Sequence, residues 1–221
     1  MRLLFIPYNQ MKYFDIHSHN GNQSILVTSI QNVIPGQAVP ESPFSAGFHP
    51  WYASDFGIAD LKKLAENKNC VAIGECGLDS LKLNVSLPEQ EKQFRVQLAL
   101  AQKMNLPVIL HVVRSEQLLE SIFSDFRNLR YIWHGFTGNI ATVKRFLKFD
   151  MYFSFGQRGI NKPDVWPGIP QDRLFCETDD ASVSIEVIYT ALSKILKIEL
   201  EQLAAIIANN TQKVFGNGLE R

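Results

Sequence analysis

The chain has 221 residues, of which 46% are hydrophobic, and its 22 Lys+Arg residues balance 22 Asp+Glu residues. This length and apolar content suffice for one sizeable core and lie near the short limit for an α/β barrel, so we expect a single domain over residues 1–221. The charge balance excludes indiscriminate binding to nucleic acid through a general excess of positive charge.

Short β-rich runs alternate with helical patterns along the chain. The strand-like runs are Tyr13–His19, Ile25–Gln31, Ser45–His49, Cys70–Gly74, Pro107–Val113, Tyr131–Phe136, Tyr152–Gly156 and Leu174–Asp179. The helical patterns are Ile58–Asn67, Pro88–Met104, Ser115–Phe126, Ile140–Phe149, Ser184–Leu196 and Glu199–Phe215. Strands that alternate with helices indicate a parallel sheet, and near-continuous apolar runs are typical of strands covered on both faces. The pattern therefore predicts an α/β fold of the TIM-type (β/α)8 barrel class.

Two connections are too short or too proline-rich for a crossover helix. Only residues 20–24 lie between the first two runs, whereas a parallel crossover normally needs a dozen or more residues. We expect a tight turn there, with little more than the irregular segment Val33–Pro43 over the outer surface of these strands. Pro163, Pro167 and Pro170 exclude a long helix before the last run. The predicted barrel is thus truncated, with its first and seventh crossover helices short or missing.

Every histidine of the chain lies at or just after the end of an apolar run, and two further runs end at acidic residues. The histidines are His17, His19, His49, His111 and His134, and the acids are Glu75 and Asp179. In a (β/α)8 barrel the carboxyl ends of the strands meet on one face, so these groups should converge there. Imidazole and carboxylate are common ligands of divalent metals, and so many polar groups in one place need a cation to balance them. The sequence therefore predicts a hydrolytic metal site.

The alternation of side chains along a strand groups these residues further. Asp15, His17 and His19 share one face of the first run, so the two imidazoles can bind one ion. Taken alone, the same spacing also occurs in ordinary polar loops. Glu177 and Asp179 share a face in the last run. Asp15 precedes His17 by two residues, and Glu177 precedes Asp179 by two residues, so both acids lie deeper in the barrel than the predicted ligands. We expect these two carboxylates to orient metal-bound histidines through hydrogen bonds without binding the metal themselves.

The cysteines are expected to be buried thiols and not metal ligands. Cys70, Cys76 and Cys176 all lie inside apolar runs, and alternation turns the last two away from the neighbouring acids. An odd number of cysteines, with no signal peptide or long apolar span, favours a cytoplasmic protein without membrane contact. No obligate protein partner is evident. Met11 directly precedes the first expected strand, so Met1 and Met11 are alternative start sites.

Seven motifs occur in a characteristic order along nearly the whole chain. They are FDIHSH, GFHP, AIGECGLD, LPVILH, HGFTGN, CETD and NTQKVFG. Together they resemble the TatD-type DNase family of metal-dependent hydrolases, a branch of the amidohydrolase-like barrels, of which this chain would be a short, divergent member. The resemblance implies two divalent metal ions. It implies that His17, His19 and Asp179 hold the first ion, that His111 and His134 hold the second, and that Glu75 bridges the two.

These roles suit the chemistry of phosphodiester hydrolysis. Two bridged cations about 3.5–4 Å apart can clamp the attacking and leaving oxygens and acidify a bound water. Glu75 would be the catalytic bridge, and Asp179 is the candidate proton acceptor and donor. A ligand set of nitrogen and oxygen fits Mg, Mn, Zn or Ni without choosing among them.

Three other residues are candidates for substrate binding. His49 corresponds to a family histidine that contacts substrate or bound water. Arg114 could hold a substrate phosphate, or be an exposed arginine at a helix start. Trp51 could stack on a base, or pack within its loop. Trp51 and Gly135 stand where the family commonly has His and Cys.

The predicted function is that of a two-metal phosphodiesterase, similar to a TatD-like 3′-end deoxyribonuclease that acts on DNA ends or another phosphodiester. Two alternatives stay open. The same barrel and ligands could hydrolyse a small amide, lactone or ester, because one fold supports many reactions. A chain that kept the site but lost its substrate rim would be a non-catalytic metal-binding protein.

Overall fold

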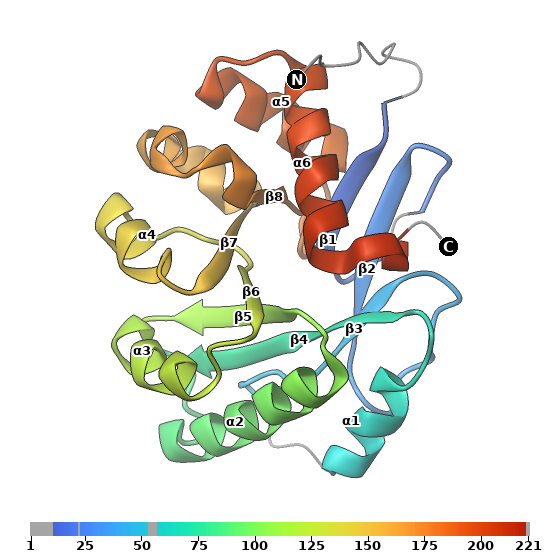
Figure 1. Cartoon of the computed structure of the whole chain (residues 1–221), viewed down its shortest axis with the longest axis vertical. Coiled ribbons are helices and arrows are strands. Elements are labelled where there is room, and N and C mark those ends of the chain that lie inside the picture. Colours follow the sequence, from blue (N-terminus) through green and yellow to red (C-terminus); the bar gives the residue numbers. More distant parts are fainter. Residues whose placement is uncertain (1–10, 22, 53–56, 220–221) are drawn as a thin grey trace.

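The computed structural model describes residues 11–21, 23–52 and 57–219. These residues form an eight-stranded sheet in the order β1-β2-β3-β4-β5-β6-β7-β8, and every neighbouring pair of strands is parallel (Figure 1). The strands are β1 (Tyr13–Ser18), β2 (Val27–Val33), β3 (Phe44–Ala46), β4 (Cys70–Asp79), β5 (Val108–Val113), β6 (Arg130–Trp133), β7 (Asp150–Phe155) and β8 (Leu174–Cys176). The predicted TIM-type architecture is confirmed. The segment before Met11 lies outside the described residues.

Helices cover the outside of the sheet. They are α1 (Ile58–Ala65), α2 (Leu87–Met104), α3 (Glu116–Asp125), α4 (Ile140–Phe146), α5 (Ile185–Leu196) and α6 (Leu200–Phe215), together with the 3-10 helices η2 (Gln157–Asn161), η3 (Pro163–Gly168), η4 (Gln171–Arg173) and η5 (Gly216–Leu219). The longest, α2, has Pro88 in its first turn and ends at Asn105, whose φ is 53°. Its buried residues Phe94, Leu98 and Ala101 recur at helical spacing on one face. No helix in the described ranges is both long and apolar enough to cross a membrane.

The barrel closes at the place where the candidate site lies. The backbone N–H of Asp179, just after β8, donates to the carbonyl of His17 in β1 at 2.9 Å. His19 N–H donates to the Asp179 carbonyl at 3.1 Å. Helices α5 and α6 pack on β1, where the Tyr189 hydroxyl accepts a bond from Phe14 N–H at 3.0 Å. The expectation that little more than Val33–Pro43 covers the first strands is therefore wrong, because the closing helices fold back over β1.

The first crossover helix is missing from the described part of the chain, as predicted. β2 nevertheless runs parallel to β1, with Tyr13 opposite Val27, so the segment 19–26 must return along the length of the strand. The expected tight turn over residues 20–24 is wrong for this reason, although Asn22 is outside the described residues. A turn lies later, where Ser24 and Val27 exchange backbone hydrogen bonds. Ile25 belongs to this turn and is 94% exposed.

The seventh crossover is confirmed as lacking a long helix. The residues between β7 and β8 form the short 3-10 helices η2, η3 and η4. Pro163 begins η3 and Pro167 lies within it, and a proline there cannot donate the backbone bond that a longer helix would require. Trp166 fills the space behind this segment and is buried against Phe155 at a ring-centroid distance of 4.7 Å. A compact irregular segment thus replaces the usual helix.

A close approach of β4 to β5 places Glu75 beside His111. Gly74 and Gly77 have φ values of 145° and 151°, a conformation that residues with a side chain rarely adopt. Gly77 pairs with His111, and a Cβ atom at Gly77 would collide with the His111 backbone carbonyl. The two glycines therefore allow β4 and β5 to lie this close together.

Gly77→Ala is expected to lower the free energy of unfolding by about 3 kcal/mol, because it adds a backbone clash to an unfavourable φ. Urea denaturation of the two proteins measures this loss. Gly57→Ala is the matched control, because Gly57 is extended and a Cβ there meets no atom closer than 3.9 Å. Equal stability of Gly77→Ala and the parent chain would show that the two strands can separate without cost.

Candidate metal centre

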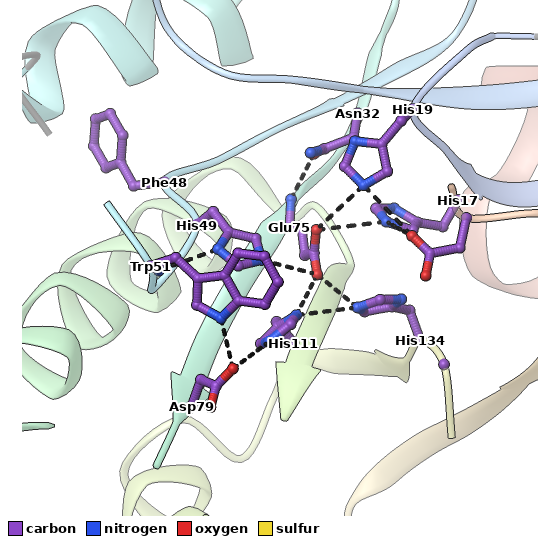
Figure 2. Close-up of polar contacts among 12 residues, drawn as sticks. His17, His19, Asn32, Phe48, His49, Trp51, Glu75, Asp79, His111 and His134 are labelled. Atoms are coloured by element: carbon purple, nitrogen blue, oxygen red, sulfur yellow. Dashed lines mark hydrogen bonds and ion pairs between the residues drawn. The ribbon is translucent and has the colours of Figure 1, made fainter. Parts of the chain in front are cut away.

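The structure brings together every histidine and both acids that the sequence predicts at the site. Figure 2 shows the histidines around Glu75. His17 lies in β1 and His19 directly after it, Glu75 in β4, and His111 in β5. His49, His134 and Asp179 follow the ends of β3, β6 and β8. Because all strands are parallel, their carboxyl ends form one rim, and the side chains converge on Glu75 from several sides.

The two carboxylate oxygens of Glu75 face different histidines. Oε1 lies 2.5 Å from His111 Nδ1, 2.6 Å from His134 Nε2 and 3.4 Å from His49 Nε2. Oε2 lies 3.5 Å from His17 Nε2 and 3.9 Å from His19 Nε2. The side chain is 2% exposed, so these histidines and not water surround it. Glu75 therefore stands between two groups of nitrogen donors.

Asp179 completes the group around Oε2 of Glu75. Its Oδ1 atom lies 3.4 Å from His19 Nε2 and 3.6 Å from His17 Nε2. The backbone of Asp179 has a φ of 56°, in the left-handed region that Asp and Asn tolerate better than most residues. The turn of the chain at this residue aims its carboxylate at the two histidines of β1.

Charges within the site shift the pKa values of its groups. Burial acts to raise the pKa of Glu75, but the charge of His134 and the hydrogen bonds with His111 and His134 lower it well below its usual range. Burial likewise opposes protonation of His134, yet the Glu75 and Glu177 carboxylates raise its pKa well above the ordinary value. For Asp179, burial is outweighed by the His19 hydrogen bond and nearby positive charge, and its pKa falls to about 2. Both acids are thus carboxylates at neutral pH.

The donor set fits divalent metal ions. Neither ring nitrogen of His17 has a hydrogen-bond partner among the described residues, although the side chain is 0% exposed. A buried imidazole without partners is costly unless another ligand satisfies it. Three groups place their donor atoms within 4.8 Å of one another, as an ion requires. They are His17 with His19 and Glu75, His17 with His134 and Asp179, and His49 with Glu75 and His111.

These groups differ in detail from the ligand pairing that the resemblance implies. His49, expected to contact substrate or water, lies within a candidate ligand group together with His111. His134 is grouped with His17 and Asp179, although its Nε2 is also 3.4 Å from His111 Nδ1. His134 therefore lies between the two halves of the site and can serve either of them.

The expected supporting roles of Glu177 and Asp15 have different outcomes. Glu177 Oε1 accepts the Gly135 N–H at 2.5 Å and lies 3.5 Å from His134 Nδ1, so this carboxylate lies beside a histidine of the site, where the prediction put it. Asp15 instead accepts both the N–H and the hydroxyl of Thr178, at 3.0 and 2.6 Å. The prediction that Asp15 holds a histidine ring is wrong, because Thr178, which follows β8, fills the space beside it. Burial raises the pKa of Asp15 to about 7.

Asp79 is a site residue that was not predicted. Its Oδ2 atom lies 3.3 Å from His111 Nε2 and accepts a hydrogen bond from Trp51 Nε1 at 2.5 Å (Figure 2). Strand alternation could have found it, because Asp79 shares a face of β4 with Glu75 and Gly77. Its contacts tie the ring of His111 to the loop after β3.

Asn32 is a second unpredicted residue, and it holds the backbone of Glu75. Its Oδ1 atom accepts the Glu75 N–H at 2.8 Å and the Ser45 hydroxyl at 3.4 Å. Asn32 lies in β2, next to no acid or histidine in the sequence, so no local signal marks it. The bond holds the backbone at Glu75 and thereby the position of its carboxylate.

A cavity of about 740 Å³ opens above the metal centre. Two of the predicted substrate residues, His49 and Trp51, line it, and Tyr52 and Leu81 add apolar surface. The Trp51 ring is covered on one side by the Lys82 ammonium, 3.3 Å from the ring centroid. The third predicted residue, Arg114, does not line this cavity but a neighbouring one.

The cysteines lie outside the ligand groups, as expected. Cys70, Cys76 and Cys176 are all free and buried. Burial raises the pKa of each thiol, to about 12 for Cys70. The thiols therefore stay protonated at neutral pH, whereas metal binding requires the thiolate.

Comparison with known proteins identifies the family of the chain. Residues 36–216 match the family described as TatD related DNase. A relative from Erwinia tasmaniensis named 3′-5′ ssDNA/RNA exonuclease TatD is 37% identical over 61% of this chain and 56% of its own length. The chain thus spans little more than half of that protein. An uncharacterized metal-dependent hydrolase from Bacillus subtilis, YabD, is 29% identical over 76% of this chain and 75% of its own length.

Solved structures share the fold. YJJV, a TatD homolog from Escherichia coli K12, superposes with a TM-score of 0.79 at 21% identity, over 93% of this chain and 98% of that one. A TatD family hydrolase from Entamoeba histolytica superposes with a TM-score of 0.77 at 18% identity, over 93% and 98% of the two chains. The barrel is the same in all three. From the match over residues 36–216, we conclude that this chain belongs to the TatD related DNase family.

Proposed function

We propose that this protein is a metal-dependent phosphodiesterase that uses two divalent cations and acts on the ends of single-stranded nucleic acid. The observation that carries the proposal is the position of Glu75, whose two oxygens face separate sets of histidines. A bridging carboxylate is the usual device that holds two catalytic cations at a fixed spacing. Membership of the TatD related DNase family supports the reaction class, and the names of relatives as 3′-5′ ssDNA/RNA exonucleases support the substrate.

Each half of the site would hold one cation. His17, His19 and Asp179 surround Oε2 of Glu75, and His111 and His134 contact Oε1. When bound, the cations would supply charge to stabilise the phosphodiester oxygens and to acidify water. Asp179 is an ionised carboxylate at the edge of the cavity, so it is the proposed acceptor of the proton released by the attacking water. The donors fit Mg, Mn, Zn or Ni.

The walls of the cavity suit one end of a flexible strand. A volume of about 740 Å³ accommodates a group of nucleotide size. Trp51 and Tyr52 form an aromatic edge, and aromatic rings bind bases of any sequence by stacking. The described parts of the connections around β2 carry no helix, which leaves the rim low on that side. We therefore propose a preference for short single strands over intact duplex, with cleavage at the 3′ end.

A second candidate is a hydrolase of small lactones or esters. The aromatic and apolar wall of Trp51, Tyr52, Ile34 and Leu81 favours it, because such a wall also binds an apolar leaving group. Trp51 in place of the usual histidine of the family makes this side of the cavity more apolar. The two candidates differ in whether the reacting group is a phosphodiester or a carboxyl ester.

The proposed location is the cytoplasm. Cys70, Cys76 and Cys176 are free and buried, and unpaired thiols are typical of proteins kept in a reducing compartment.

Protein purified without chelators is expected to contain divalent metal and to release mononucleotides from a short single-stranded oligonucleotide when Mn or Mg is present. It should also hydrolyse bis-p-nitrophenyl phosphate, and excess chelator should abolish both activities. Glu75→Gln, prepared in parallel, controls for contaminating nucleases. Lactone hydrolysis without phosphodiester cleavage would support the second candidate instead. Bound metal with no turnover of any substrate would identify a non-catalytic metal-binding protein.

A further inference from the structure

A second cavity of about 430 Å³ lies beside the metal centre. Val113 and Arg158 line both this cavity and the larger one, so the two adjoin. The second cavity is built partly from residues that follow the ligand histidines in the chain, namely Arg114 after β5 and Gly135 after His134. A molecule that reaches the metal centre can therefore extend into it.

The second cavity has the opposite charge from the first. Its lining contains three cationic side chains, Arg114, Arg158 and Lys162, and a single acid, Glu116. The larger cavity contains more acids than cations: the acids of the metal site with Asp79 and Asp180, against Lys82 and Arg158. A chain with balanced charge thus gathers a local positive surface next to its acidic centre.

The cations of this cavity are available to a ligand. Arg114, Arg158 and Lys162 are all exposed. Among the described residues, the arginines in ion pairs are Arg95, Arg145 and Arg173. Neither arginine of the cavity is therefore neutralised by an acid in the described part of the chain.

The segments that carry these cations are held in place. Lys162 Nζ donates to the Thr137 carbonyl at 2.5 Å, which ties the end of η2 to the loop before α4. Arg114 has a φ of 52°, which is uncommon for a residue with a side chain. The next residue, Ser115, is buried and donates its hydroxyl to the Leu78 carbonyl at 2.8 Å. The backbone at Arg114 is therefore anchored to β4 close to His111.

We propose that Arg114, Arg158 and Lys162 form a phosphate subsite, which holds the backbone phosphate of a nucleotide next to the one cleaved at the metal centre. The inference rests on the proposed function and deepens it. Guanidinium groups bind phosphate through paired hydrogen bonds, and an ammonium adds a point charge. A strand of DNA or RNA offers a second phosphate at this side, whereas an isolated diester or a lactone does not. The subsite thus selects polynucleotides.

The double variant Arg158→Gln/Lys162→Gln is expected to lower kcat/KM for a single-stranded octanucleotide by about tenfold or more. Hydrolysis of bis-p-nitrophenyl phosphate should change by less than about twofold. The salt dependence of octanucleotide binding should also weaken, by about 0.7 in logarithmic slope for each phosphate that the variant no longer neutralises. Lys103→Gln/Arg127→Gln is the matched control, because it removes the same charge from residues that precede β5 and β6 at the opposite end of the barrel. An equal fall on both substrates, or no fall on either, would overturn the subsite.

Changing the substrate, and not the protein, tests the same contact between the subsite and a backbone phosphate. Octanucleotides in which one backbone phosphate at a time is replaced by a neutral methylphosphonate should lose affinity at one position near the scissile linkage. In the double variant, the replacement at that position should cost clearly less than in the parent, because only Arg114 of the subsite remains to contact the phosphate. Independent, additive losses would contradict the proposal. Matched DNA and RNA strands should behave alike, and a loss confined to RNA would show that the 2′-hydroxyl is recognised instead.

Binding measured in excess chelator separates this inference from the proposed function. If no phosphodiester is cleaved with any metal, but octanucleotide binding still depends on Arg158 and Lys162, the proposed function fails and the subsite stands. If the protein cleaves oligonucleotides and the double variant matches the parent in both binding and cleavage, the function stands and the subsite fails.

Discussion

Glu75→Gln is expected to weaken the binding of both proposed cations by at least about a hundredfold. This loss of affinity exceeds the usual loss on altering a residue that only hydrogen-bonds to a metal ligand. The reason is geometric. Both oxygens of Glu75 face nitrogen donors, with Oε1 2.6 Å from His134 Nε2 and Oε2 3.5 Å from His17 Nε2. A glutamine offers an oxygen to one half of the site and an N–H donor to the other, and it lacks the negative charge that both cations require.

Isothermal titration with Mn or Zn, together with metal analysis of the purified protein, measures this effect. Glu41→Gln is the matched control, because Glu41 is exposed and precedes β3, at the end of the barrel away from the site. The control should keep the parent's stoichiometry and affinity. Loss of a single ion from Glu75→Gln, with the second bound as in the parent, would rule out a bridging role.

Asp179→Asn is expected to lower kcat by a factor of about 10²–10⁴ while the fold and metal binding largely persist. The amide keeps an oxygen that can face His19 and His17, now 3.4 and 3.6 Å from Asp179 Oδ1. It cannot accept a proton at neutral pH. Asparagine also tolerates the left-handed backbone, with a φ of 56°, that closes the barrel at this residue. The substitution therefore removes the proposed base and spares its surroundings.

Single-turnover cleavage of a short oligonucleotide at saturating Mn measures the chemical step apart from binding. Metal content and the thermal unfolding temperature confirm that the variant remains folded and loaded. Asp164→Asn is the control for loss of a negative charge, because the Asp164 side chain in η3 is exposed, and this variant should behave as the parent does. A change in rate of only a few fold would place the proton acceptor elsewhere.

The members of the metal centre could be predicted because each is marked by its own stretch of sequence. His17, Glu75, His111 and Asp179 all end or follow an apolar run, and the barrel brings the ends of parallel strands to one rim. Strand alternation then separates these predicted ligands from Cys76. Both the apolar runs and the alternation of side chains involve only neighbouring residues, so a single sequence is enough to recognise them.

The ends of the strands, and the helices that cover the first strand, were harder to predict, because both depend on contacts with distant parts of the chain. The β2 strand begins at Val27 and not Ile25, since the turn at Ser24 precedes it. The β4 strand continues to Asp79 because β5 pairs with it that far, which brings an unexpected carboxylate to His111. The closing helices, and not the segment 34–43 alone, cover β1.

By itself, the sequence determined the barrel class, the gathering of histidines and acids at the strand ends and the two connections without long helices, because periodicity, proline and loop length act within a few residues. Only the tertiary structure decided how the ligands divide around Glu75 and where positive charge gathers. Arg114 and Lys162 come from separate segments, each ordinary in its own context. Their charges lie in one cavity only because β5 and β7 end on the same rim of the barrel. The spacing of residues along the sequence does not reveal this proximity.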